Sequence, residues 1–186
     1  MSESRFPRVV SLACHDLRTP LATVYGFART LTRAGDLDER TMRFLGMIEE
    51  ASEQMTELLD DLGVAARIEG GRWEPAVREA DTLELASSDD ERIVTEGTGE
   101  AIETEPESVG RALRSLAIAA SRYGAADRVT WRVDGRKLEL SPVTADAAPV
   151  VTGESVRDLG SLIARVVVEA LGGSIELDGE TLRVSL

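Results

Sequence analysis

Residues 10–31 read VSLACHDLRTPLATVYGFARTL, and the apolar positions in this stretch recur in alternating steps of four and three residues. These positions are Val10, Cys14, Leu17, Leu21, Val24, Ala28 and Leu31. Such a heptad pattern is typical of a helix that packs an apolar seam along another helix. We therefore predict a first helix of about 28 residues, about 42 Å long at 1.5 Å per residue.

A second helix is predicted after a turn at residues 34–38, where Gly35 closes the first helix and Asp38 caps the next. Its seam consists of Phe44, Ile48, Ala51, Met55, Leu58, Leu62 and Ala65, widened by Leu45 and Leu59. A single antiparallel hairpin cannot cover a stripe of this width. The pattern therefore predicts that two hairpins pair into a four-helix bundle, so that the chain forms a homodimer.

Beyond Gly70-Gly71 the pattern changes to short alternating runs separated by turn residues, which predicts a domain boundary near residue 72. Predicted strands cover residues 82–85, 92–94, 129–133, 137–140, 174–177 and 182–186, and predicted helices cover 106–124 and about 156–171. Asp134-Gly135 and Asp178-Gly179 are strong hairpin signals. The predicted fold class is α followed by α+β, with a helical hairpin over residues 1–71 and an α/β sandwich over residues 72–186.

The composition excludes several classes of partner. A formal net charge of −13 argues against nucleic acid and against an anionic membrane surface, since both would repel the chain. With Cys14 as the one cysteine, no intramolecular disulfide can form. Residues 1–5 contain no apolar signal segment, and no stretch approaches 18 consecutive apolar residues, so we expect no membrane span and a cytoplasmic location.

The only histidine, His15, opens the run HDLRTPL over residues 15–21. If Cys14 and Leu17 point into the bundle, His15 faces outward, with Thr19 one turn along on the same face. A neutral imidazole nitrogen can accept a phosphoryl group as a phosphoramidate and pass it on. The Asp16 carboxylate can orient the ring tautomer or accept its proton, and Pro20 is expected to bend the helix beside the histidine.

This run resembles the phosphoacceptor motif of bacterial two-component sensor histidine kinases. The heptad hairpin resembles their dimerisation and histidine-phosphotransfer domain over roughly residues 5 to 70. The resemblance implies that His15 carries the phosphoryl group, that Asp16 assists as a base and that Thr19 positions water for phosphatase activity. It also implies response-regulator receiver domains as partners, with Mg²⁺ held on the receiver. We expect the receiver to dock on the outward side chains Arg18, Ala22, Thr23 and Arg29.

The remainder resembles, in outline, the ATP-binding domain of the same kinases, through residues 104–116 and 172–175. Its functional residues depart from that pattern. Ala119 occupies the position of the magnesium-binding asparagine, and a methyl group cannot ligate Mg²⁺. No Asp-x-Gly-x-Gly turn follows Leu140, and the phosphate-side loop keeps only Gly160, next to the carboxylate of Asp158. We therefore expect no cofactor or metal on this chain, and no useful ATP binding.

Three hypotheses follow from these residues. The first is a dimeric phosphorelay protein that exchanges a phosphoryl group on His15 with receiver aspartates and carries a degenerate ATPase-like domain. The second is an ATP-dependent sensor histidine kinase with a diverged nucleotide site. The third is an adaptor that binds receivers without transfer. The intact His15-Asp16-x-x-Thr19 pattern disfavours the third, and the absent glycine turns disfavour the second.

Overall fold

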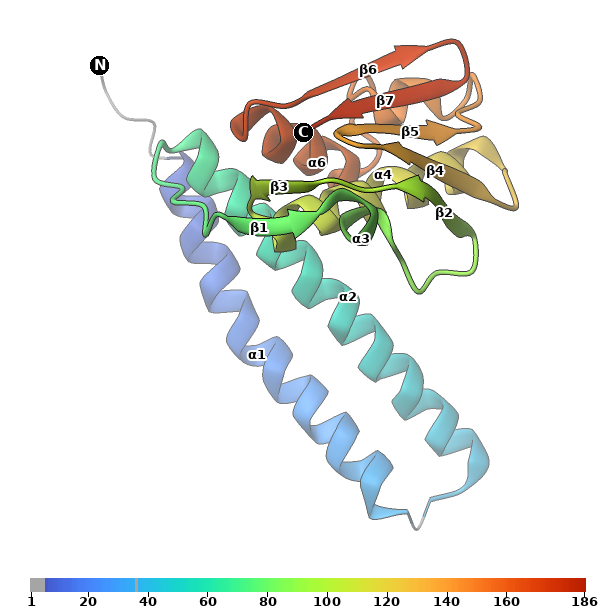
Figure 1. The fold of residues 1–186 in the computed structure, drawn as a ribbon. Coiled ribbons are helices and arrows are strands. Elements are labelled where there is room, and N and C mark those ends of the chain that lie inside the picture. Colours follow the sequence, from blue (N-terminus) through green and yellow to red (C-terminus); the bar gives the residue numbers. More distant parts are fainter. Residues whose placement is uncertain (1–5, 36) are drawn as a thin grey trace. The chain divides into compact units, whose positions relative to one another are not determined.

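The computed structural model describes residues 6–35 and 37–186; Met1–Arg5 and Asp36, which falls in the predicted turn, lie outside the described residues. The chain divides into two compact units, one ending at Trp73 and the other spanning Glu74–Leu186 (Figure 1). The domain boundary near residue 72 stays a prediction.

The first unit is an antiparallel hairpin of two long helices, α1 (Phe6–Ala34) and α2 (Glu39–Glu69), as the heptad pattern predicts (Figure 1). Asp38 caps α2, since its carboxylate accepts a hydrogen bond of 3.0 Å from the Thr41 backbone N–H. Gly35 has a φ of +76°, a backbone conformation that glycine adopts without steric cost.

Within the hairpin, α1 buries Pro7, Cys14, Leu21 and Ala28, one residue in every heptad. Only part of the seam predicted on α2 is buried within the single hairpin. Leu45 and Ser52 are buried, whereas Phe44, Ile48, Met55 and Leu58 are 42–47% exposed. Neighbouring residues of a helix point about 100° apart, so an apolar stripe this wide covers two directions, and only one of them faces α1.

The second unit contains eleven elements. In chain order they are β1 (Arg78–Asp81), α3 (Thr82–Ala86), β2 (Ile93–Thr98), β3 (Ala101–Thr104), α4 (Pro106–Gly124), β4 (Val129–Asp134), β5 (Lys137–Ser141), α5 (Ala148–Val151), α6 (Leu159–Ala170), β6 (Ser174–Asp178) and β7 (Thr181–Ser185). Strands β1 and β3 form a two-stranded antiparallel sheet. The larger sheet has the order β2-β4-β5-β7-β6, in which only the β2–β4 pair is parallel. The predicted fold class, a helical hairpin followed by an α/β sandwich, is confirmed.

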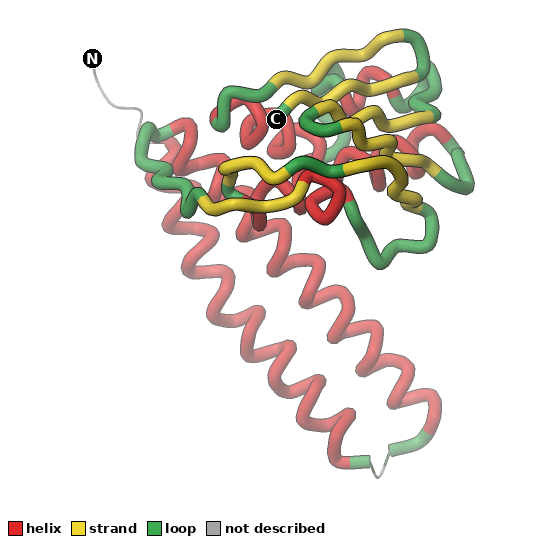
Figure 2. Tube along the Cα trace, viewed as in Figure 1, coloured by secondary structure: helices red, strands yellow, loops and turns green. Residues whose placement is uncertain are grey.

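The two faces of the larger sheet differ in chemistry. Within the second unit, helices α4 and α6 pack against one face (Figure 2). The side chains directed there include Trp131, Leu140 and Leu182, which lie opposite one another on adjacent strands and are fully buried. This row forms the centre of the core.

On the other face a row of alternating charge crosses all five strands. The register places five residues directly opposite one another: Glu96, Arg132, Glu139, Arg183 and Glu176. Arg132 Nη2 donates to Glu96 Oε1 at 3.2 Å, and Arg183 Nε donates to Glu139 Oε1 at 3.0 Å. Opposite charges in directly facing positions favour this register over one that brings like charges together.

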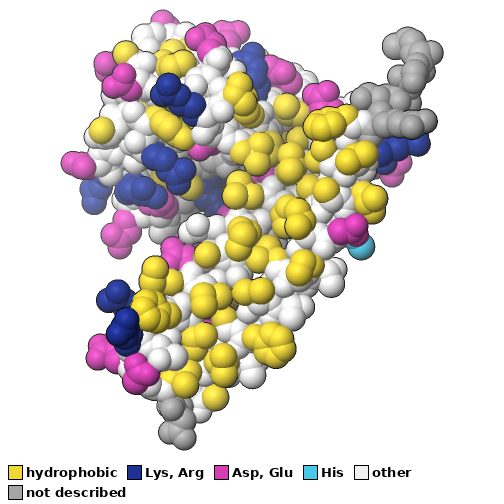
Figure 3. All heavy atoms as spheres, turned by 180° about the vertical axis from the view of Figure 1, so that it is seen from behind, with side chains coloured by type: hydrophobic (Ala, Val, Ile, Leu, Met, Phe, Trp, Pro, Cys, Tyr) yellow, Lys and Arg dark blue, Asp and Glu magenta, His cyan; other side chains and the backbone are white. Residues whose placement is uncertain are grey.

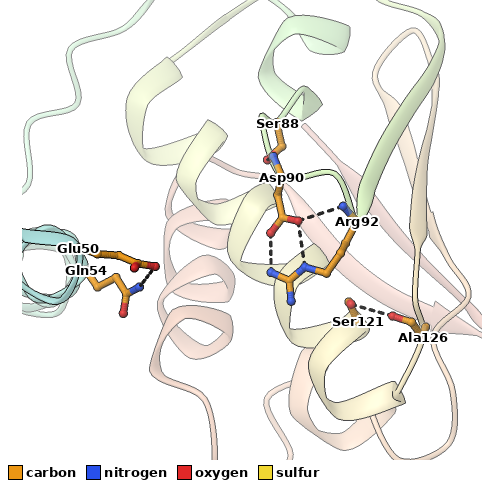
Figure 4. Close-up of polar contacts among 7 residues, drawn as sticks. All are labelled: Glu50, Gln54, Ser88, Asp90, Arg92, Ser121 and Ala126. Carbon is orange, nitrogen blue, oxygen red and sulfur yellow. Dashed lines mark hydrogen bonds and ion pairs between the residues drawn. The ribbon is translucent and has the colours of Figure 1, made fainter. Parts of the chain in front are cut away.

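Polar contacts fix the turn before β2 (Figure 4). The Asp90 carboxylate accepts from Arg92 Nε at 2.9 Å and from the Arg92 backbone N–H at 3.0 Å. These hydrogen bonds from Arg92 lower the pKa of Asp90 to about 2. In the last turn of α4, Ser121 Oγ donates to the Ala126 carbonyl at 2.8 Å.

The strand predicted at residues 82–85 is wrong, since these residues form α3. The Asp81 carboxylate accepts from the backbone N–H groups of Leu83 and Glu84 at 2.8 and 3.3 Å, which starts a helix instead. The last helix begins at Leu159 rather than near residue 156, because Asp158 caps it by accepting from the Ser161 N–H at 2.9 Å. Strands β1 and β3 and helix α5 were not predicted.

Candidate functional site

His15 lies near the middle of the first half of α1, with its side chain 76% exposed. The preceding residue, Cys14, is buried against the hairpin, so the helical repeat turns the imidazole outward. His15 Nδ1 is 3.2 Å from Asp16 Oδ1, within hydrogen-bonding distance. When Nδ1 carries the proton and donates it to Asp16, the Nε2 lone pair is free to act as a nucleophile.

A shallow hollow of about 540 Å³ adjoins the imidazole. It is lined by His15, Arg18, Thr19, Ala22 and Thr23. Arg18 is the only one of these side chains with a permanent charge, and it is positive. The hollow therefore combines a nucleophile, a guanidinium and two hydroxyl groups on one face of α1.

Helix α1 continues through Pro20 without interruption. Proline lacks the N–H that would bond the Asp16 carbonyl. One turn further on, Thr23 Oγ1 donates to the Thr19 carbonyl at 3.1 Å, so the Thr23 hydroxyl is tied to its own helix. The bend expected at Pro20 stays a prediction.

Three of the four predicted partner-binding residues line the hollow, and the fourth does not. Arg18, Ala22 and Thr23 line the hollow beside His15. Arg29 does not, because its guanidinium lies 5.7 Å from the centre of the Tyr25 ring and Nη1 donates to the Tyr25 hydroxyl at 3.2 Å.

Polar contacts to α2 were missed by the sequence reasoning. Arg18 Nη2 donates to Asp60 Oδ1, and the Tyr25 hydroxyl donates to Glu53 Oε1 at 2.9 Å. The bond to Glu53 is the largest of the effects that raise the pKa of Tyr25. A step of seven along α1 is matched here by a step of seven back along α2, as antiparallel helices require. Once one of these contacts was known, the seven-residue spacing could have predicted the other.

The hydrophobic residues left exposed on the hairpin gather into a patch, visible in Figure 3. Leu17, Val24 and Leu31 of α1 are 48–55% exposed and are spaced seven residues apart. On α2 the patch contains Phe44, Ile48, Met55 and Leu58. An apolar surface of this extent is typical of a protein interface.

In the second unit, the regions compared above with the nucleotide site of the kinase ATP-binding domain contain buried apolar residues. Ala119 is fully buried in α4. The segment that follows β5 buries Val143, Ala147, Val150 and Val151, each at most 1% exposed. At the start of α6, a Cβ added to Gly160 would lie 3.0 Å from Ser115 Oγ, so this helix approaches α4 closely.

Across residues 6–35 and 37–186, no group of three or more His, Cys, Asp or Glu side chains is arranged to hold a metal ion. No helix within the same described ranges combines the length and apolar character needed to cross a membrane.

Comparisons with known proteins agree on the first unit. Residues 8–71 match the family model of the His Kinase A (phospho-acceptor) domain. The chain is 35% identical over 71 residues to the probable sensor histidine kinase TcrY of Mycobacterium tuberculosis, a match that covers 38% of this chain and 15% of that protein. The chain thus spans well under half the length of this curated relative.

Two solved structures share the fold. Full-length ShkA in complex with AMPPNP has a TM-score of 0.63 at 20% identity, over 96% of this chain and 44% of that one. The Acinetobacter baumannii histidine kinase AdeS has a TM-score of 0.54 at 20% identity, over 92% of this chain and 97% of that one. At this level of identity the similarity concerns the fold alone.

Proposed function

We propose, from the premise that the chain is a member of the two-component histidine kinase family, that it is a phosphorelay protein which carries a phosphoryl group on His15. The group would come from the aspartyl phosphate of a response-regulator receiver domain and pass to another receiver or to water. The observation that carries this proposal is the exposed His15 imidazole with Asp16 at its Nδ1, within a phospho-acceptor domain.

The chemistry follows from the geometry. Nε2 of His15 attacks the phosphorus, a P–N bond forms, and the P–O bond to the receiver aspartate breaks, with its electron pair remaining on that carboxylate. The ring proton on Nδ1 passes to Asp16, 3.2 Å away. Transfer onward reverses these steps, and the Mg²⁺ that neutralises the phosphoryl charge would lie on the receiver.

The hydrophobic patch supports a homodimer. A single hairpin leaves Leu17, Val24 and Leu31 half-exposed, and a second copy would cover them in a four-helix bundle. His15 lies outside this patch, so dimerisation would leave it accessible to a receiver.

The second unit supports transfer between proteins over autophosphorylation from ATP. The segment after β5 packs its valines into the core, and the Asp158 carboxylate caps α6 where a triphosphate would be expected. An ATP-dependent kinase with a diverged nucleotide site is the alternative, and a receiver-binding adaptor without transfer is the third candidate.

Labelling from two donors tests the proposal. The protein is incubated with labelled ATP and Mg²⁺ and, separately, with phosphorylated receivers from the source cell. Acid-labile, base-stable label from a receiver but not from ATP is expected. Label from ATP alone would support the kinase alternative, and label from neither donor would support the adaptor.

Nucleotide binding is expected to be absent, or to have a dissociation constant in the high micromolar range or weaker. A lost charge-assisted hydrogen bond of about 1.5 to 3 kcal/mol to adenine alone weakens affinity by tens of fold. Calorimetry with ATP and Mg²⁺ checks this, with an ATP-binding histidine kinase as positive control. A low micromolar constant would contradict the expectation.

Thr19→Ala is expected to slow any dephosphorylation of a receiver by about tenfold or more, since a group that positions water acts through geometry. Phosphorylation of His15 should persist, because Thr19 lines the hollow without being the nucleophile. Release of phosphate from a phosphorylated receiver is measured with the parent and the variant. Equal rates would assign Thr19 a helical role only.

A further inference from the structure

We propose that Arg18 binds the phosphoryl group on His15, and that Asp60 is a positioning residue which competes with that group for the same guanidinium. The inference rests on the proposed function, since it assigns roles within the same site. In this proposal Arg18 pairs with Asp60 while His15 is unphosphorylated, and with the phosphoryl group once His15 is phosphorylated.

The placement of Arg18 supports this role. It lies three residues after His15, and residues at this spacing are neighbours on a helix surface, with Cβ atoms about 5–6 Å apart. Both side chains line the hollow. A guanidinium presents five N–H donors in a planar fork that fits phosphoryl oxygens, and the contact with Asp60 engages Nη2.

The charges around His15 favour a cation beside the phosphoryl group. Asp16 Oδ1 lies 3.2 Å from the imidazole and Asp60 is bound to Arg18, so an arriving phosphoryl group meets two carboxylates on a chain of net charge −13. Like charges at close range oppose the uptake of an anion. Among the residues that line the hollow, Arg18 alone provides a permanent opposite charge.

The ion pair with Asp60 can be exchanged easily. Both side chains are accessible, Arg18 at 44% and Asp60 at 42%, and exposed ion pairs contribute little to stability. A phosphoryl group carries more negative charge than one carboxylate and offers three acceptor oxygens. We therefore expect Arg18 to leave Asp60 when His15 is phosphorylated.

A purely structural ion pair makes a different prediction. If the contact only joins α1 to α2, as Tyr25 and Glu53 do, removal of either partner breaks the same contact and the two variants change in the same direction. If Asp60 competes with the phosphoryl group for Arg18, removal of Arg18 weakens phosphorylation and removal of Asp60 strengthens it.

The experiment uses phosphoramidate, a small donor that needs no receiver. Its P–N bond breaks, ammonia leaves, and a P–N bond to His15 forms while the ring proton is released. Because His15 is the only histidine, label that is acid-labile and base-stable reports phosphohistidine at one site. The full chain is compared with Arg18→Ala, Arg18→Lys and Asp60→Asn, after circular dichroism has established equal helicity.

Arg18→Ala is expected to lower the uptake rate and Asp60→Asn to raise it, each by about two- to fivefold, the scale of an exposed ion pair. Arg18→Lys should restore part of the loss. Arg33→Ala and Glu53→Gln carry the same charge changes at exposed positions outside the hollow and should change the rate less.

Changes of the same sign in Arg18→Ala and Asp60→Asn, or changes no larger than in the two controls, would overturn the inference. So would a parent protein that phosphoramidate cannot label. Failure of receivers to transfer to His15, with the opposite-sign pattern intact, would instead contradict the proposed function and leave the role of Arg18 standing.

Discussion

A His15→Gln variant is expected to take up no phosphoryl group from any receiver, while its helicity and its dimer persist. The chain has no second histidine, and a glutamine amide is not a nucleophile at neutral pH. The side chain is 76% exposed, so its replacement leaves no cavity, and the buried neighbour Cys14 is untouched. We expect the donor to dock on the helical face that continues from His15 through Thr19, Ala22, Thr23 and Arg29.

Labelled transfer from a phosphorylated receiver, followed by an acid-lability test, measures this. Thr30→Gln is a matched control, because it places the same side chain at another exposed position of α1 and should transfer at the parent rate. If the His15→Gln variant still takes up label, or if no receiver of the source cell transfers to the parent, the phosphotransfer proposal fails and the adaptor takes its place.

A Val24→Asp variant is expected to convert the proposed dimer to a monomer. Val24 is 49% exposed in the single chain and lies between Leu17 and Leu31 on the hydrophobic patch. In a symmetric bundle the substitution occurs twice and buries two unpaired carboxylates. At about 1–3 kcal/mol for each unsatisfied group, the dimer dissociation constant should rise by roughly a hundredfold or more.

Light scattering at micromolar concentration checks this result, with circular dichroism to verify that the helices remain. Thr30→Asp adds the same charge at an exposed position outside the hydrophobic patch and should leave the dimer intact. A parent protein that is monomeric at this concentration with normal helicity would remove the homodimer from the proposal.

The helical hairpin could be predicted because its signal is long and redundant. Seven apolar residues keep the heptad spacing over residues 10–31, and a period sustained for so many turns fits no strand. The two hairpins of the larger sheet were equally explicit. Gly135 and Gly179 have φ values of +58° and +60°, which the turn residues Asp-Gly favour.

Short elements could not be predicted in the same way. Thr82-Leu83-Glu84-Leu85 alternates polar and apolar residues, but four residues are too few to distinguish a strand from one helical turn, and the Asp81 cap decides for the helix. Strand β3 contains one strongly apolar residue, Ile102, and forms by pairing with β1. Pairing between distant segments is tertiary information.

In the candidate site, too, geometry within one helix could be predicted and contacts between helices could not. His15, Asp16 and Thr19 belong to one helix, so helical geometry alone predicts which of them share a face. The contact between Arg18 and Asp60 depends on the register of α1 against α2. A shift of one residue at the turn between the helices would replace Asp60 by a neighbour, and no pattern within either helix fixes that register.

The charged row on the outer face of the larger sheet has a consequence for how sequences of this kind diverge. Each of Arg132, Glu139 and Arg183 faces an opposite charge on both sides. Reversal of any one of these three charges would create two like-charged pairs, and reversal of two neighbours would create a like-charged pair on each side where the row continues. Only reversal of all five charges preserves every opposite pair. Natural variants of this sheet should therefore keep the alternation of sign along the row, so that the order of the strands is recorded in the charge pattern of the sequence.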